Sequence, residues 1–380
     1  MTTLIRAQGP RELLAYVPYR LGYRPQDSIV LVGLRSPRGR VGLVVRVDVA
    51  DLVDPDHGPR LARSVVGHLT ADGARRVVLV LYSDALLDAG GPDAVRARAA
   101  VARCRDAAEP VHGAADTWVV TSSGWFGLDC DDPDCCPPGG RALRELESSE
   151  VGAHMVLAGH GLADSREEAL RIPRASADAR RRAARAARRV REQALAAAPD
   201  ARGSTDGLDH RVRALAAWRD AVALVARDEP GAPSGGPTAT ELGRLAAGLE
   251  SIPVRDAVLV SLVPGTGDLA DRTVRGADVD AGTGAAIAAI VDPVVGLAPD
   301  PEVTGPARAV LEAVVAHVPR GRATPALTLL ALVAWWHGDG SRASQRLDEA
   351  LAEDSTYRLA LLLASALDAG VPPGWIRADV

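Results

Sequence analysis

The sequence predicts an α/β domain at the N-terminus, followed by an all-helical C-terminal region. In the first 165 residues, short apolar runs alternate with helical patterns, which is typical of strands joined by crossover helices. After residue 165 the apolar residues recur three and four positions apart, which is typical of helices that bury one face.

The predicted sheet begins with a hairpin. A short helix between Pro10 and Pro18 precedes an expected strand over 28–34, and Pro37 and Gly39 predict the turn into a second strand over 41–49. Because side chains alternate along a strand, Arg46 and Asp48 share one face of this second strand and are placed to form an ion pair.

Two further strands are expected over 76–81 and 117–121. Helical patterns over 61–69 and 92–108 precede them. Strand, helix and strand in this order imply parallel strands with right-handed crossovers. The prediction is therefore a mainly parallel sheet with an antiparallel hairpin at its edge.

Polar residues cluster where these strands end. Ligands in open α/β sheets usually bind beyond the carboxyl ends of parallel strands. The residues expected along that edge are Asp48, Ser83, Asp84, Ser122, Ser123 and Gly124. Serine and aspartate also cap helices and turns, so a purely structural role is the alternative.

The C-terminal half divides into two helical stretches. We expect an Arg/Ala-rich helical segment over 166–228, a linker over the Gly-, Pro- and Ser-rich residues 229–237, and a helical domain over 238–380. Residues 327–370 resemble a tetratricopeptide-like helical hairpin, although the match covers one repeat. A regular helix there would bury one of the neighbouring indoles Trp335 and Trp336 and leave the other more exposed.

The densest group of reactive side chains lies in the loop 125–139. Cys130, Cys135 and Cys136 place three thiols within seven positions. Such thiolates can bind zinc, with His154, His160 or an aspartate completing the shell. The alternatives are structural thiols in a turn-rich loop and a redox disulfide. Four interleaved aspartates are expected to raise the pKa of the thiols, which argues against a catalytic nucleophile.

Composition excludes several functions. The chain has no Lys, which removes the Walker-type phosphate loop and Schiff-base chemistry. The net charge of -5 argues against nucleic acid as a partner, and we interpret the Arg-rich stretch 174–191 as a solvated helix face. No apolar run reaches the length of a membrane span or a signal peptide, which predicts a cytoplasmic protein with no membrane partner.

Several segments together resemble an uncharacterised actinobacterial family, the domain of unknown function numbered 4192. The segments that carry the resemblance are Val17 to Ser28, Arg46 to Asp48, Cys130 to Gly139, Trp336 to Gly340 and Gly370 to Pro373. The resemblance spans nearly the whole chain and implies a bacterial cytoplasmic protein, but it carries no activity. The site candidates that it marks are Asp27, Ser28, Arg46, Asp48, Cys130, Cys135 and Cys136. The structural alternative for the first segment is a Pro- and Gly-shaped turn before a strand.

These observations favour a non-enzymatic ligand-binding or protein-binding regulatory protein. Its N-terminal edge would hold a small ligand or a metal ion, and its C-terminal helices would engage a protein partner. The main alternative is a metal-assisted hydrolase or transferase, with Asp48, Asp84 and the Cys loop around one ion at the carboxyl ends of the strands. A purely structural interaction module is the third hypothesis.

Overall fold

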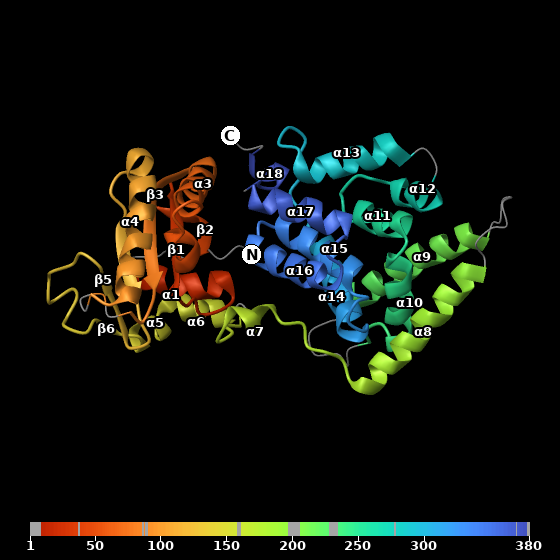
Figure 1. The fold of residues 1–380 in the computed structure, drawn as a ribbon, viewed down its shortest axis with the longest axis horizontal. Helices are drawn as coiled ribbons and strands as arrows, with labels where there is room; N and C mark the ends of the chain where they lie inside the picture. The colour runs from red at the N-terminus through yellow and green to blue at the C-terminus, as the bar shows by residue number, and fades with distance from the viewer. Residues whose placement is uncertain are drawn as a thin grey trace. The chain divides into compact units, whose positions relative to one another are not determined.

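The computed structural model describes residues 9–36, 39–85, 87, 90–157, 161–196, 206–227, 235–276, 279–369 and 371–377. It divides into two compact units, with the boundary between Arg171 and Ile172. The first unit contains the sheet, and the second is helical (Figure 1). The expected α/β region followed by helices is therefore confirmed.

The sheet has six strands in the order β2-β1-β3-β4-β5-β6. The strands are β1 (Ser28–Arg35), β2 (Arg40–Asp48), β3 (Ala74–Tyr82), β4 (Asp116–Val120), β5 (Gly124–Gly127) and β6 (Arg141–Ala142). Apolar residues on both faces of β1 and β3 are buried, as their continuous apolar sequences indicate.

The sheet is mixed rather than mainly parallel, which corrects the prediction. Among the strands that the structure describes, only β3 and β4 pair in parallel, and the other neighbouring strands are antiparallel. The reason is that β1 inserts between β2 and β3 and runs opposite to both. The strands β2, β3 and β4 still point the same way, so their carboxyl ends share one edge of the sheet with the start of β1.

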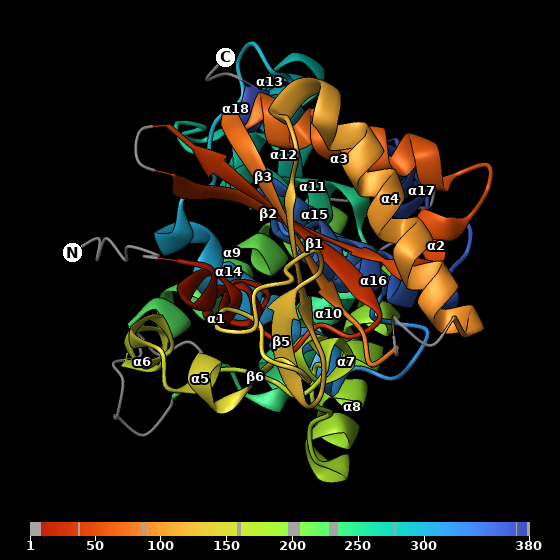
Figure 2. The ribbon, with the colours of Figure 1, turned by 90° about the vertical axis from the view of Figure 1, so that its left-hand side faces the viewer.

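Helices cover both faces of the sheet (Figure 2). On one face, α2 (Val49–Val53), α3 (Gly58–Ala71) and α4 (Pro92–His112) share a core with Ile29, Leu79 and Val119. Cys104 lies in this core with no exposed surface, as expected. On the other face, α1 (Pro10–Leu21) packs Leu14 and Val17 against Val30 and Val80. The connection after β6 forms α5 (Arg144–Glu147), α6 (Glu150–Leu157) and α7 (Arg166–Leu170).

The first helix is longer than predicted. It continues through Pro18 and ends at Leu21, where Gly22 adopts a left-handed conformation and donates its N–H to the carbonyl of Pro18. Burial of the apolar face of α1 on the sheet outweighs the backbone hydrogen bond that Pro18 cannot make.

The second unit is a helical assembly around one core. Its helices are α8 (Ala177–Ala196), α9 (Asp206–Ala226), α10 (Ala239–Leu249), α11 (Ile252–Ser261), α12 (Leu269–Arg275), α13 (Val279–Val291), α14 (Pro301–His317), α15 (Thr324–Trp336), α16 (Gly340–Glu353), α17 (Arg358–Asp368) and α18 (Gly374–Arg377). Leu215 and Trp218 of α9 belong to the same core as the later helices. The expected linker lies largely outside the described residues, and the finer division of this half stays a prediction.

Every residue of α15 is buried. Both Trp335 and Trp336 are therefore buried, which corrects the expectation of one exposed indole. Each indole N–H donates to a backbone carbonyl, of Val371 and Leu297 respectively. The wrong prediction assumed a helix with a solvent face, whereas α15 lies inside the helical unit. None of the described helices is long and apolar enough to cross a membrane.

Candidate metal centre and polar sheet edge

The Cys loop connects the last two strands of the sheet. It leaves β5 after Gly127 and returns to β6 at Arg141. Glycine is required at Gly124, because a Cβ atom there would lie 2.6 Å from the carbonyl oxygen of Arg141 on the neighbouring strand. The loop therefore starts and ends on a closely paired, rigid strand segment.

The three thiols of this loop converge. The Sγ atoms of Cys130, Cys135 and Cys136 all lie within 4.8 Å of one another, and those of Cys135 and Cys136 are 3.9 Å apart. A zinc ion with Zn–S bonds of about 2.3 Å in tetrahedral geometry requires sulfur atoms roughly 3.8 Å apart. The three sulfur atoms are therefore close enough to act as ligands of one metal ion.

Backbone N–H groups point at two of the sulfur atoms. Gly127 donates to Cys136 Sγ at 3.2 Å, and the N–H of Asp132 donates to Cys130. The Asp132 hydrogen bond lowers the pKa of the Cys130 thiol, with help from the Cys136 and Cys135 thiols. The expected rise from the aspartates is therefore wrong for Cys130, because the backbone donor outweighs their charge.

Cys135 behaves in the opposite way. Its hydrogen bonds with Cys130 and Cys136 raise the pKa of the Cys135 thiol to about 11. This rise comes first from the neighbouring sulfur atoms and not from the aspartates. Cys130 is therefore the first of these two thiols to ionise, and its thiolate stabilises the protonated form of Cys135.

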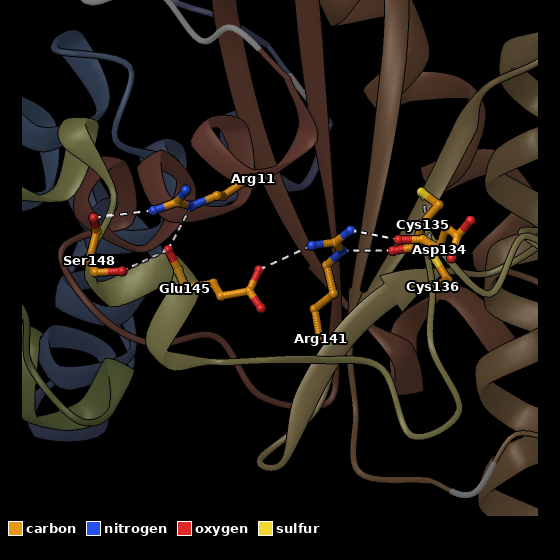
Figure 3. A network of polar contacts seen from close by, with 7 residues as sticks. All are labelled: Arg11, Asp134, Cys135, Cys136, Arg141, Glu145 and Ser148. Atoms are coloured by element: carbon orange, nitrogen blue, oxygen red, sulfur yellow. Dashed lines mark hydrogen bonds and ion pairs between the residues drawn. The ribbon is translucent and has the colours of Figure 1, made fainter.

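Arg141 holds the loop in place. Its guanidinium donates to the carbonyl oxygens of Cys135 at 2.7 Å and Asp134 at 2.9 Å, and it pairs with Glu145 at 3.5 Å (Figure 3). The carbonyl of Glu145 in turn accepts from Arg11 of α1 at 2.8 Å. This network links the thiol loop to α5 and α1. The sequence gives no signal for Arg141, because no motif marks an arginine that binds backbone carbonyls.

No fourth protein ligand joins the thiols in the described part of the chain. His154 lies on α6 and is exposed, and His160 lies outside the described residues. Asp129 forms an ion pair with Arg105 instead of turning to the sulfur atoms. Within those residues, three thiolates can hold an ion and a fourth position is left for water or another ligand.

The structure brings the other candidates together at one edge of the sheet. Ser28 lies directly opposite Asp48 on β2 and Tyr82 on β3, and Tyr82 pairs with Val120 of β4. The residues that lie at this polar edge are Asp27, Ser28, Arg46, Asp48, Ser83, Asp84, Ser122 and Ser123. Their role in ligand binding stays a prediction.

Several of these residues hold the loops at the polar edge. The carboxylate of Asp84 accepts the N–H of Ser122 at 2.5 Å, and Ser83 Oγ accepts the N–H of Ala85 at 3.2 Å. Ser123 shares a hydrogen bond of 3.0 Å with Thr121. These contacts match the structural alternative, in which serine and aspartate fix turns.

Arg46 and Asp48 form the predicted ion pair. Two nitrogens of Arg46 donate to the two carboxylate oxygens of Asp48 at 2.9 and 2.6 Å. The neighbouring hydroxyls of Ser28 and Tyr82 are buried and have no hydrogen-bond partner in the part of the chain that the structure describes. Burial also raises the pKa of Tyr82, so that its hydroxyl remains a protonated donor. The sequence does not mark Tyr82 as a site residue, because Tyr82 stands at the end of an apolar run.

The thiol loop and the polar edge are separate. Leu128 donates to the carbonyl of Thr117 at the start of β4, whereas the polar edge lies at the end of β4. Asp48 is also four strand positions away from β5, about 19 Å at a spacing of roughly 4.8 Å. The hydrolase hypothesis requires Asp48, Asp84 and the thiols to surround one ion. In the described residues they do not.

Comparisons with known proteins and protein families identify the family of this chain. No curated protein and no solved structure matches the chain. A family model described as a domain of unknown function, DUF4192, matches residues 10–374 and so covers the sheet, the thiol loop and the helical unit. The chain therefore belongs to the DUF4192 family.

Proposed function

We propose that this chain is a zinc-binding protein in which Cys130, Cys135 and Cys136 hold one ion. The single observation that carries the proposal is the convergence of the three Sγ atoms within 4.8 Å. A disulfide would use only two of these thiols, and thiols that serve only as apolar packing would be buried like Cys104. Zinc uses all three.

In this proposal the ion stabilises the structure of a binding protein and does not catalyse hydrolysis. Three thiolates and one Zn²⁺ carry a net charge of -1, and exposed Asp131 and Asp132 add negative charge nearby. A metal ion lowers the pKa of bound water through its positive charge, and this site leaves little of that charge uncompensated. The ion would instead fix a loop that has no regular secondary structure of its own.

This arrangement supports a regulatory or binding protein. The zinc-fixed loop would present the exposed carboxylates of Asp131, Asp132 and Asp134 on a rigid surface. A protein partner at the C-terminal helices is a separate proposal, which the zinc site neither requires nor tests.

The experiment is elemental analysis of protein purified without a metal-affinity tag or chelator. We expect about one zinc per chain in the parent and loss of zinc in Cys135→Ser and Cys136→Ser. Cys104→Ala is the matched control and keeps its zinc, because Cys104 is a buried core residue of α4 and does not belong to the group of three converging thiols. A parent that remains zinc-free after loading with Zn²⁺, or thiol variants that keep it, would contradict the proposal.

Thiol reactivity gives an independent readout that does not need a variant. In the zinc-loaded parent, a thiol reagent should react slowly with the loop cysteines, and removal of zinc by a chelator should expose three more reactive thiols per chain. An equal count of reactive thiols with and without zinc would argue against thiolate ligation.

A further inference from the structure

A cavity of about 350 Å³ lies within the helical unit. Trp218 and Val222 of α9 form one wall, and Leu262 and Val303 line it from the end of α11 and from α14. Its volume falls in the range of small-molecule sites, which are about 300–1,000 Å³ and mainly apolar with few polar groups. The cavity is far in sequence from the thiol loop and is independent of the zinc proposal.

Small residues keep the cavity open. Ala223 of α9, Ala270 of α12 and Gly267 of the intervening turn all lie on its walls. Gly265 and Gly267 have positive φ values of 77° and 54°, which shape the turn that borders the cavity. No side chain of these residues is long enough to fill the space.

The polar groups that line the cavity differ in whether they can accept a hydrogen bond from a ligand or donate one to it. Ser261 donates its hydroxyl hydrogen to the carbonyl of Val258 at 2.6 Å, and Thr266 donates to Val263 at 3.0 Å. Both hydroxyls can therefore only accept a hydrogen bond from a ligand. Arg219 donates one N–H from each terminal nitrogen to Asp271, at 2.9 and 2.7 Å, which leaves its Nε–H and two further N–H groups for another acceptor.

We propose that this cavity binds a small, mainly apolar molecule that carries one carboxylate. The apolar part would contact Trp218, Val222 and Leu262, and the carboxylate would accept hydrogen bonds from Arg219. The residues that line the cavity do not suit a dinucleotide. The turn Gly265-Thr266-Gly267 opens only the seven-residue α12, and a single arginine that is already paired with Asp271 cannot neutralise a pyrophosphate.

The test uses octanoate and 1-octanol as matched probes, because they share the same alkyl chain and differ in charge. Isothermal titration calorimetry of the full chain should give saturable binding of one octanoate per chain, about tenfold tighter than octanol. Absence of saturable octanoate binding to the folded parent would overturn the proposal. Equal affinity for the two probes would overturn the role of the carboxylate.

Two pairs of variants locate the site. Ala223→Phe fills the cavity and should abolish binding of both probes, whereas Ala226→Phe, on the same helix but outside the cavity, should leave binding unchanged. Arg219→Gln should reduce the affinity for octanoate to that for octanol, whereas Arg213→Gln on the same helix should not. Octanoate binding that survives Ala223→Phe would place the ligand elsewhere and contradict the assignment.

Discussion

Arg141 shows how one side chain orders a segment without regular secondary structure. It binds two backbone carbonyls of the thiol loop and lies 5.8 Å from the ring centre of Trp125 on β5. The guanidinium is thus held by the carbonyls, an aromatic face and Glu145 at once. The loop needs this support, because carbonyls in an irregular segment have no ladder partners.

Arg141→Gln should weaken zinc binding by roughly tenfold, because groups that orient metal ligands typically contribute tenfold to a hundredfold in affinity. Competition with a chromophoric zinc chelator measures the change. Arg144→Gln is the matched control, since Arg144 is exposed on the following helix and does not bind the loop. Equal zinc affinities of Arg141→Gln and the parent would show that the loop is organised without this clamp.

Residue patterns predicted contacts that depend on strand periodicity. The alternation of side chains in β2 was sufficient to predict the pair of Arg46 and Asp48. Counting the charges of the interleaved aspartates gave the wrong direction for the pKa of Cys130. Charges can be counted along a sequence, but the N–H of Asp132 reaches the sulfur only through the path of the folded loop.

At the scale of elements, the sequence predicted which segments are strands better than whether neighbouring strands are parallel or antiparallel. The runs that became β1, β2, β3 and β4 were all expected, and β1 follows from its apolar residues alone. The expectation of mainly parallel pairing was wrong, because an apolar run buried on both faces fits equally well beside a parallel or an antiparallel neighbour. The short β5 and β6 were not predicted, since the two glycines of β5 resemble a loop and β6 has only two residues.

Close packing of α8 against α10 depends on Gly243. A Cβ atom at this position would lie 2.1 Å from the backbone carbonyl oxygen of Ala183. Gly243→Ala should therefore destabilise the helical unit by about 1–3 kcal/mol through overpacking, despite the better helix propensity of alanine. Differential scanning calorimetry of the full chain measures the change as a lower transition temperature of this unit.

Gly284→Ala on α13 is the control for that variant. Gly284 is exposed, and apart from its chain neighbours and the backbone of its own helix, no described atom lies within 4 Å of the position its Cβ would occupy. The substitution should stabilise the helix by about 0.5–1 kcal/mol, because alanine loses less backbone entropy than glycine. If the Gly243→Ala protein were as stable as the parent, α8 and α10 could move apart without a loss in the free energy of unfolding, which would contradict this prediction.

At the scale of the whole molecule, each unit has its own core. Two apolar clusters cover the two faces of the sheet, and one larger cluster fills the helical unit. The order of an α/β part and a helical part was predictable, since it depends on periodicity over long segments. The cavity beside Trp218 was not, because its walls come from α9, the turn before α12 and α14, which are distant in sequence.

The two candidate sites, the polar edge and the thiol loop, lie in different parts of the first unit. The polar edge and the thiol loop lie at opposite ends of β4, which sequence order does not reveal. The edge residues Ser83, Asp84 and Ser123 make turn-fixing hydrogen bonds, whereas the thiols converge on one point. That contrast is the reason to assign the metal to the loop rather than to the edge of the sheet.

X-ray absorption spectroscopy at the zinc edge of the zinc-loaded full chain tests this assignment most directly. It reports the type, number and distance of the atoms bound to the ion. The account predicts three sulfur atoms at about 2.3 Å and one lighter ligand at about 2.0–2.2 Å. A spectrum with nitrogen and oxygen ligands only, or with fewer than three sulfur atoms, would contradict the assignment of Cys130, Cys135 and Cys136 as the zinc site.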